Sequence, residues 1–167
     1  MQKKLPERVD FLKQVERKAC FEGAWPLSRF ERLGDIISDN SGDVTARLKF
    51  GISAGTRCLD GSIEAELEMR CERCLEPVKK HIESGFRFGL ITSEDEAEFL
   101  PKEFEPLLVT ESEQSLIELI EDELLLSLPI VAKHDEECSE ILQKHKQDEK
   151  GQHDTYRPFA ALKDLMN

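Results

Sequence analysis

The sequence lacks the features that would point to a membrane span or to a disulfide framework. No apolar run in its 167 residues approaches the roughly 18 that a membrane span needs. The amino terminus leads into charged sequence instead of the apolar core of a signal peptide, so we expect a cytoplasmic protein. Five cysteines, an odd number, then fit reduced thiols with metal or redox use better than disulfides.

Positive charge is also scarce. Lysine plus arginine is 23 and aspartate plus glutamate is 35, which leaves a net charge of −12. A phosphate backbone is held by a surplus of Lys and Arg, so this balance excludes a general basic nucleic-acid binder. Residues 94–123 hold twelve acids against one base, Lys102. Such a stretch is either a solvated face that aids solubility or a docking surface for a basic partner.

No pattern of residues indicates catalysis. The sequence contains none of the motifs typical of serine hydrolases, P-loop nucleotidases, dinucleotide-binding domains or zinc proteases. None of its four histidines stands beside an evident nucleophile. We therefore expect a non-enzymatic protein.

The clearest structural signal is an alternation of apolar and polar residues in three neighbouring stretches, 43–52, 59–71 and 78–90. A period of two over successive runs predicts antiparallel strands with one buried and one solvated face. Residues 104–109 would add a further strand. The predicted fold class is α+β: an antiparallel β-meander or partly closed barrel, packed by a few helices.

Three segments, 8–20, 26–37 and 110–128, have apolar residues at helical spacing. In the last of them Thr110 and Glu113 fit a capping box, and Pro129 marks the end. Its apolar residues share one face and are Leu116, Ile117, Ile120, Leu124 and Leu128, with Leu119 and Leu126 widening it. The acids Glu118, Glu121 and Asp122 gather on the opposite side, where we expect solvent.

The domain organisation follows from where apolar residues become sparse. Residues 1–138 form one α+β domain, 139–155 a flexible polar linker, and 156–167 a short amphipathic helix. On that helix Phe159, Leu162 and Leu165 share one face. A helix this short must dock on the body or on a partner, and the long linker favours the partner.

Two cysteines, Cys71 and Cys74, lie where one predicted strand ends and the next begins. With the later His134 and Cys138 they would complete a closed tetrahedral zinc site of three thiolates and one imidazole. Two other interpretations stay open. Cys71 falls on the apolar phase of its strand and fits simple packing. A redox pair is less favoured, because Pro77 and a strand follow instead of a helix.

Three motifs together resemble the bacterial YceD family, the large ribosomal RNA subunit accumulation proteins. They are C-E-R-C-L-E-P (71–77), E-D-E-L-L-L-S-L-P-I-V-A-K-H (121–134) and R-P-F-A-A-L (157–162). The resemblance covers nearly the whole chain. The residues that carry the family signature are Cys71, Arg73, Cys74, Leu75, Pro77, Glu121, Asp122 and Glu123, with a downstream histidine and cysteine at His134 and Cys138.

The resemblance implies a role in making or keeping 23S ribosomal RNA, and hence in assembly of the large ribosomal subunit. It implies no catalytic residues. Two hypotheses follow. In the first, an acidic surface with Glu118, Glu121 and Asp122, together with Phe159 and Leu162, engages basic ribosomal proteins or a precursor particle, and contact with rRNA is indirect. In the second, rRNA is bound directly by Arg8, Lys13, Arg17, Lys18, Arg70, Arg73, Lys79 and Lys80.

Overall fold

The computed structural model describes residues 5–110 and 112–138. The chain divides into two compact units, residues 1–133 and residues 134–167. The first unit contains all the described helices and strands, and residues 134–138 of the second contain neither. The predicted linker 139–155 and the terminal helix 156–167, with Phe159 and Leu162, lie outside the described residues. The first unit has an α+β fold, as predicted.

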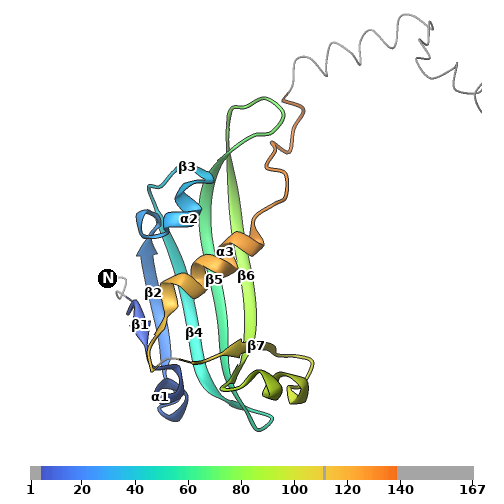
Figure 1. Ribbon diagram of the computed structural model, residues 1–167. Helices are drawn as coiled ribbons and strands as arrows, with labels where there is room; N and C mark the ends of the chain where they lie inside the picture. Colours follow the sequence, from blue (N-terminus) through green and yellow to red (C-terminus); the bar gives the residue numbers. More distant parts are fainter. Residues whose placement is uncertain (1–4, 111, 139–167) are drawn as a thin grey trace, which may run out of the picture. The chain divides into compact units, whose positions relative to one another are not determined.

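An antiparallel meander of three long strands forms the centre of the first unit (Figure 1). It consists of β4 (Asp43–Ser53), β5 (Thr56–Arg70) and β6 (Pro77–Ile91). Val44 pairs with Ala65 across β4 and β5, and Ala65 pairs with Ile82 across β5 and β6. All three residues are buried, so the alternation in the sequence predicted both the strands and the face that they bury.

Three further strands extend the meander, and two more pair with each other beside it. β2 (Cys20–Pro26) pairs with β4. β3 (Ile37–Asp39) pairs with the C-terminal end of β5, at residues that β4 does not reach. β7 (Glu105–Leu108) confirms the strand predicted at 104–109 and pairs in parallel with β6. β1 (Arg8–Val9) and β8 (Gln114–Ser115) form a separate two-stranded sheet. The main sheet is open and is not closed into a barrel.

Two of the predicted helices are much shorter than expected. In the segment 8–20 the helix is limited to α1 (Phe11–Glu16), which Asp10 caps. The two ends of the segment belong to the strands β1 and β2 instead. The single helix predicted over 26–37 was wrong. That segment contains a 3-10 turn η1 (Leu27–Arg29), α2 (Glu31–Gly34) and β3. Its apolar residues Leu27, Phe30, Leu33 and Ile37 are nevertheless all buried. A further 3-10 segment, η2 (Glu94–Phe99), follows β6.

The helix α3 (Leu116–Ser127) packs on β6 and crosses the sheet obliquely (Figure 1). It starts later than predicted: Ser115, not Thr110, is the N-cap, and its hydroxyl accepts from the Glu118 N–H at 3.3 Å. Three residues one turn apart, Leu116, Ile120 and Leu124, are fully buried. Leu126, expected to widen this face, is 80% exposed. None of the described helices is long and apolar enough to span a membrane.

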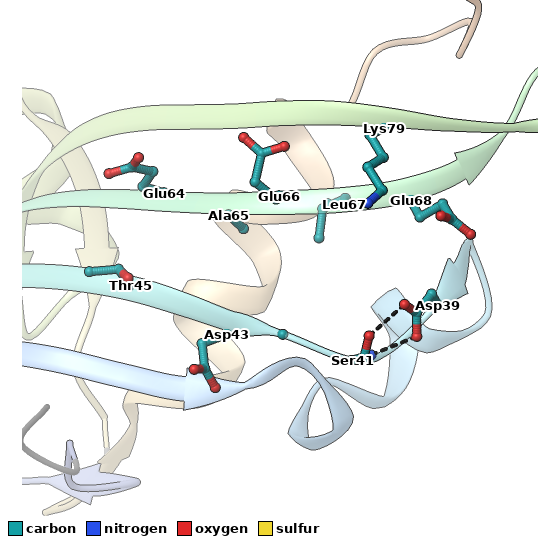
Figure 2. Close-up of a pocket in the computed structure, with 11 residues that line it drawn as sticks. Asp39, Ser41, Asp43, Thr45, Glu64, Ala65, Glu66, Leu67, Glu68 and Lys79 are labelled. Atoms are coloured by element: carbon teal, nitrogen blue, oxygen red, sulfur yellow. Dashed lines mark hydrogen bonds between the residues drawn. The ribbon is translucent and has the colours of Figure 1, made fainter.

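The opposite face of the meander carries charged side chains (Figure 2). Glu64, Glu66 and Glu68 of β5 line a groove of 330 Å³ together with Lys79 of β6. The Asp39 carboxylate, at the same groove, accepts from the hydroxyl and the N–H of Ser41. These bonds, the hydroxyl first, lower the pKa of Asp39. This face is solvated, as the period-two pattern predicted.

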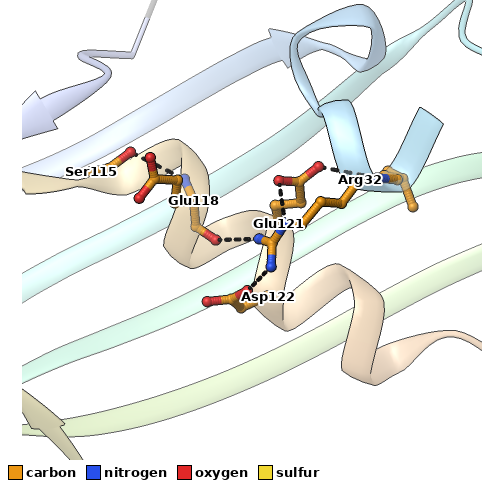
Figure 3. Close-up of polar contacts among 6 residues, drawn as sticks. Arg32, Ser115, Glu118, Glu121 and Asp122 are labelled. Atoms are coloured by element: carbon orange, nitrogen blue, oxygen red, sulfur yellow. Dashed lines mark hydrogen bonds and ion pairs between the residues drawn. The ribbon is translucent and has the colours of Figure 1, made fainter. Parts of the chain in front are cut away.

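One carboxylate ties α3 to α2 (Figure 3). Glu121 is only 6% exposed, and its oxygens accept from the Leu33 N–H at 3.1 Å and from Arg32 Nε at 3.0 Å. Arg32 also pairs with Asp122 at 2.7 Å. The expectation that Glu121 faces solvent beside Glu118 and Asp122 was therefore wrong. A buried carboxylate needs such donors, and α2 provides them.

We expect Glu121→Ala to destabilise the protein by about 2 kcal/mol, because the buried Leu33 N–H would lose its acceptor. Asp122→Ala is the matched control: it is the next residue, shares Arg32 as partner and is half exposed, so its loss should cost less than about 0.5 kcal/mol. Urea denaturation of both variants measures the difference. Equal losses would show that Glu121 does not hold α2 and α3 together.

Candidate metal centre and acidic surface

The turn between β5 and β6 holds the first two predicted metal ligands. The Cys71 N–H donates to the Glu76 carbonyl at 2.9 Å, and the Leu75 N–H donates to the Cys71 carbonyl at 2.9 Å. The Arg73 N–H points at the Cys71 sulfur at 3.4 Å. A backbone donor at this distance orients the Cys71 sulfur within the turn. The local fold is therefore suited to presenting sulfur ligands.

Leu75, directly after the second cysteine, has a φ of +66°. This left-handed conformation costs a residue with a Cβ roughly 1–2 kcal/mol, which explains why a small residue is usual at this position of a metal-binding turn. The side chain of Leu75 is 57% exposed, so it does not obstruct the turn. The turn keeps its shape despite the larger residue.

After α3 the chain returns to this turn. The carbonyl of Ala132 accepts from the Glu72 N–H at 2.8 Å, and Ala132 is buried. His134 follows two residues later, which limits its Cα to about 7 Å from that of Ala132. One backbone hydrogen bond thus brings a residue some sixty positions along the chain close to Cys71 and Cys74.

The four predicted ligands form a candidate Cys₃His metal site. The ligand atoms of Cys71, Cys74, His134 and Cys138 all lie within 4.8 Å of one another. Sulfurs bound to one zinc at about 2.3 Å would be about 3.8 Å apart, so small movements would suffice to close the site. Three sulfurs and one imidazole are the ligand set of a structural zinc, and the arrangement is compatible with one.

The other two interpretations of these cysteines fare differently. Cys71 is fully buried, so the packing interpretation holds for its side chain alongside a ligand role. The turn continues into the strand β6 and not into a helix, so the helix N-terminus typical of redox motifs is missing there. Cys20 is exposed and Cys58 is buried outside the cluster. Burial raises the pKa of the Cys58 thiol and keeps it neutral.

The acids of α3 fall into two groups. Glu118 and Asp122 are exposed, and Glu123 is half-buried. Burial, followed by repulsion from Glu105 and Asp122, raises the pKa of Glu123. Glu121 is taken up by its contacts with α2. The exposed acidic surface of the helix is therefore smaller than the sequence suggested, and Glu121 holds it in place.

The basic residues of the second hypothesis do not form one surface. Phe11 of α1 packs on Phe50, which pairs with Leu59 of β5. Arg70 lies eleven residues further along β5, roughly 36 Å away at about 3.3 Å per residue. The basic residues near α1 and those near the β5–β6 turn are thus at opposite ends of the strand. Lys13 is in addition paired with Asp10 at 2.9 Å.

Sequence reasoning missed two features that involve acidic residues. One is Arg32, which orders the acids of α3 but belongs to a segment predicted as a different helix. The other is the acidic groove on the far side of the sheet, lined by Glu64, Glu66 and Glu68. The alternation marked these three glutamates as solvent-facing, but only the fold shows that Asp39 and Asp43 join them.

Comparison with known proteins gives a consistent result. The family model for the large ribosomal RNA subunit accumulation protein YceD matches residues 59–166. The protein of that name from Haemophilus influenzae is 33% identical over 144 residues, which cover 84% of this chain and 83% of the relative. No solved structure matches the chain. The match includes the cysteine turn, α3 and both later ligands, and the chain belongs to the YceD family of large ribosomal RNA subunit accumulation proteins.

Proposed function

We propose that this protein supports the accumulation of 23S rRNA and the assembly of the large ribosomal subunit by binding basic ribosomal proteins, alone or on a precursor particle. The support from the comparisons is the name of the relative, which ties that protein to accumulation of the large-subunit RNA. The observation that carries the mode of action is α3, which bears four acids and no base on a single twelve-residue helix.

The acidic surface has the properties expected of an electrostatic docking site. Glu118 and Asp122 are exposed on a helix that Glu121 fixes against α2, so their positions are set before a partner arrives. Preset charges attract an oppositely charged partner and raise the association rate. The proposed role needs no catalytic step, is carried out in the cytoplasm, and leaves rRNA contact to the ribosomal proteins.

Direct rRNA binding is the second candidate, and the geometry favours it less. RNA phosphates need several bases close together, and here the candidates lie at both ends of β5 in a chain of net charge −12. The acidic groove beside Lys79 would also repel an RNA backbone.

The double variant Glu118→Lys and Asp122→Lys tests the acidic surface while keeping the buried Glu121. Its melting temperature checks that Arg32, the partner of both Glu121 and Asp122, still holds α2 to α3. We expect its affinity for the RNA-free protein fraction of purified large subunits to fall at least tenfold, and rRNA levels to fall in cells that carry only this variant. Repulsion of a basic partner is the reason, and high salt should reduce the difference.

The control Glu16→Lys and Glu83→Lys makes the same change of net charge at two exposed acids away from α3. It should bind nearly as the unaltered protein does. If both double variants lose affinity equally, overall charge and not α3 determines binding, and the proposed surface is wrong.

We further propose that Cys71, Cys74, His134 and Cys138 hold one structural zinc ion. The mutual distances support this, as does the hydrogen bond from the Arg73 N–H to the Cys71 sulfur. Zinc there would fix the segment after α3 to the β5–β6 turn, and its binding energy would add to folding stability. Zinc would supply no reaction chemistry in such a closed site.

Metal analysis of protein purified without chelator should give about one zinc per chain. Cys74→Ser should abolish this content and lower the melting temperature by at least about 5 °C, whereas Cys20→Ser, at an exposed cysteine outside the cluster, should change neither. A metal-free wild-type protein whose melting temperature does not respond to added zinc would contradict the site.

A further inference from the structure

Large apolar side chains are exposed together at the C-terminal end of α3. Leu126 is 80% exposed, Ile130 is fully exposed and Ile36 is 45% exposed. All three line one groove of 480 Å³. Clusters of this kind, unlike scattered exposed residues, are typical of interaction sites. The exposed Ile52 and Phe99 do not line this groove.

The groove is formed by ordered parts of the first unit. Met69 at the end of β5 is nearly buried and contributes to the lining, as does Leu125. One wall is the segment 128–132, which leaves α3 at Pro129 and is held to the β5–β6 turn by the Glu72–Ala132 hydrogen bond. The remaining lining residues are Arg70, Glu72, Leu128, Pro129 and Ala132.

The charges beside the groove indicate which partner fits. Asp122 and Glu123 lie three or four residues before Leu126, so they neighbour it on the helix surface. Arg32 pairs with Asp122. Burial, followed by repulsion from Glu105 and Asp122, raises the pKa of Glu123. A cation placed near Glu123 would relieve that repulsion. The charged residues that line the groove itself, Arg70 and Glu72, balance each other, so the negative charge beside it comes from the acids of α3.

A second copy of the chain fits this surface poorly. A two-fold interface would place the same acidic helix of both copies side by side, and like charges across an interface cost affinity. A basic amphipathic segment, in contrast, satisfies the apolar groove and the acids at once.

We infer that this groove binds an amphipathic segment of a basic protein, with apolar side chains against Leu126 and Ile130 and Lys or Arg residues toward the acids of α3. The inference rests on the proposed function and adds an apolar anchor to the electrostatic surface. Charge would bring the partner to α3, and the groove would hold it.

The test uses the full chain with Leu126→Glu and Ile130→Glu, and the RNA-free protein fraction of purified large subunits as the probe. Both side chains are exposed, and melting temperatures check that the fold is kept. We expect affinity to fall at least tenfold. Charge alone would predict the opposite, because added glutamates should attract a basic partner more strongly. Ile52→Glu, at an exposed isoleucine of β4, is the control and should leave binding unchanged.

Unchanged or stronger binding by the groove variant would overturn the inference. The proposed function would still stand if the Lys variant of Glu118 and Asp122 lost affinity in the same assay. A wild-type dimer in sedimentation that Ile130→Glu converts to monomer would assign the groove to a second copy instead. Binding that rises tenfold when residues 139–167 are removed would assign it to the chain's own C-terminal segment. Either result would overturn the proposed occupant.

Discussion

The apolar face of the long β4–β5–β6 meander has to be shielded from water, and the position of α3 follows from this need. Leu116, Ile120 and Leu124 belong to α3, which packs on β6, and they have no measurable exposure. Burying three such side chains contributes roughly 1.5–3 kcal/mol each, which together exceeds the about 2 kcal/mol expected from the contacts of Glu121. The helix is therefore placed by its apolar face, and Glu121 then fixes its rotation through α2. What α3 presents to solvent is a consequence of what it buries.

The three features on which the proposals rest all depend on this one helix. Its outer side carries Glu118 and Asp122, its C-terminal end forms one side of the apolar groove, and the segment after it returns to the cysteine turn. The helix is held by the sheet on one side and by α2 through Glu121 on the other. These features therefore keep fixed positions relative to one another within the first unit. A surface fixed in this way loses little conformational entropy on binding, and this favours affinity.

The sequence predicted best what depends on local periodicity. The alternation in β4, β5 and β6 located each strand within a few residues, because a half-buried strand needs only its own pattern. The helix over 26–37 failed because Gly34 is a poor helix former and Ile37 gains more by pairing with β5. Glu121 was misplaced because it lies only about 20° outside the apolar arc of α3, and its donors come from the misassigned α2. The burial of such residues depends on contacts between segments that are distant in the sequence, and the periodicity of one segment does not predict these contacts.

For the cysteine cluster, the sequence predicted the residues but not how the fold brings them together. Ligand type and spacing indicated the four residues, yet nothing local explains why position 134 should approach position 71. The fold explains it: Pro129 ends α3, and a single hydrogen bond to Glu72 directs the chain back along the turn. The segment 128–132 is both the wall of the groove and the connection to His134. A metal ion bound by the cluster would restrain this segment at its far end, as α3 does at its near end. The metal ion and the partner, as proposed, would therefore both act on the segment 128–132.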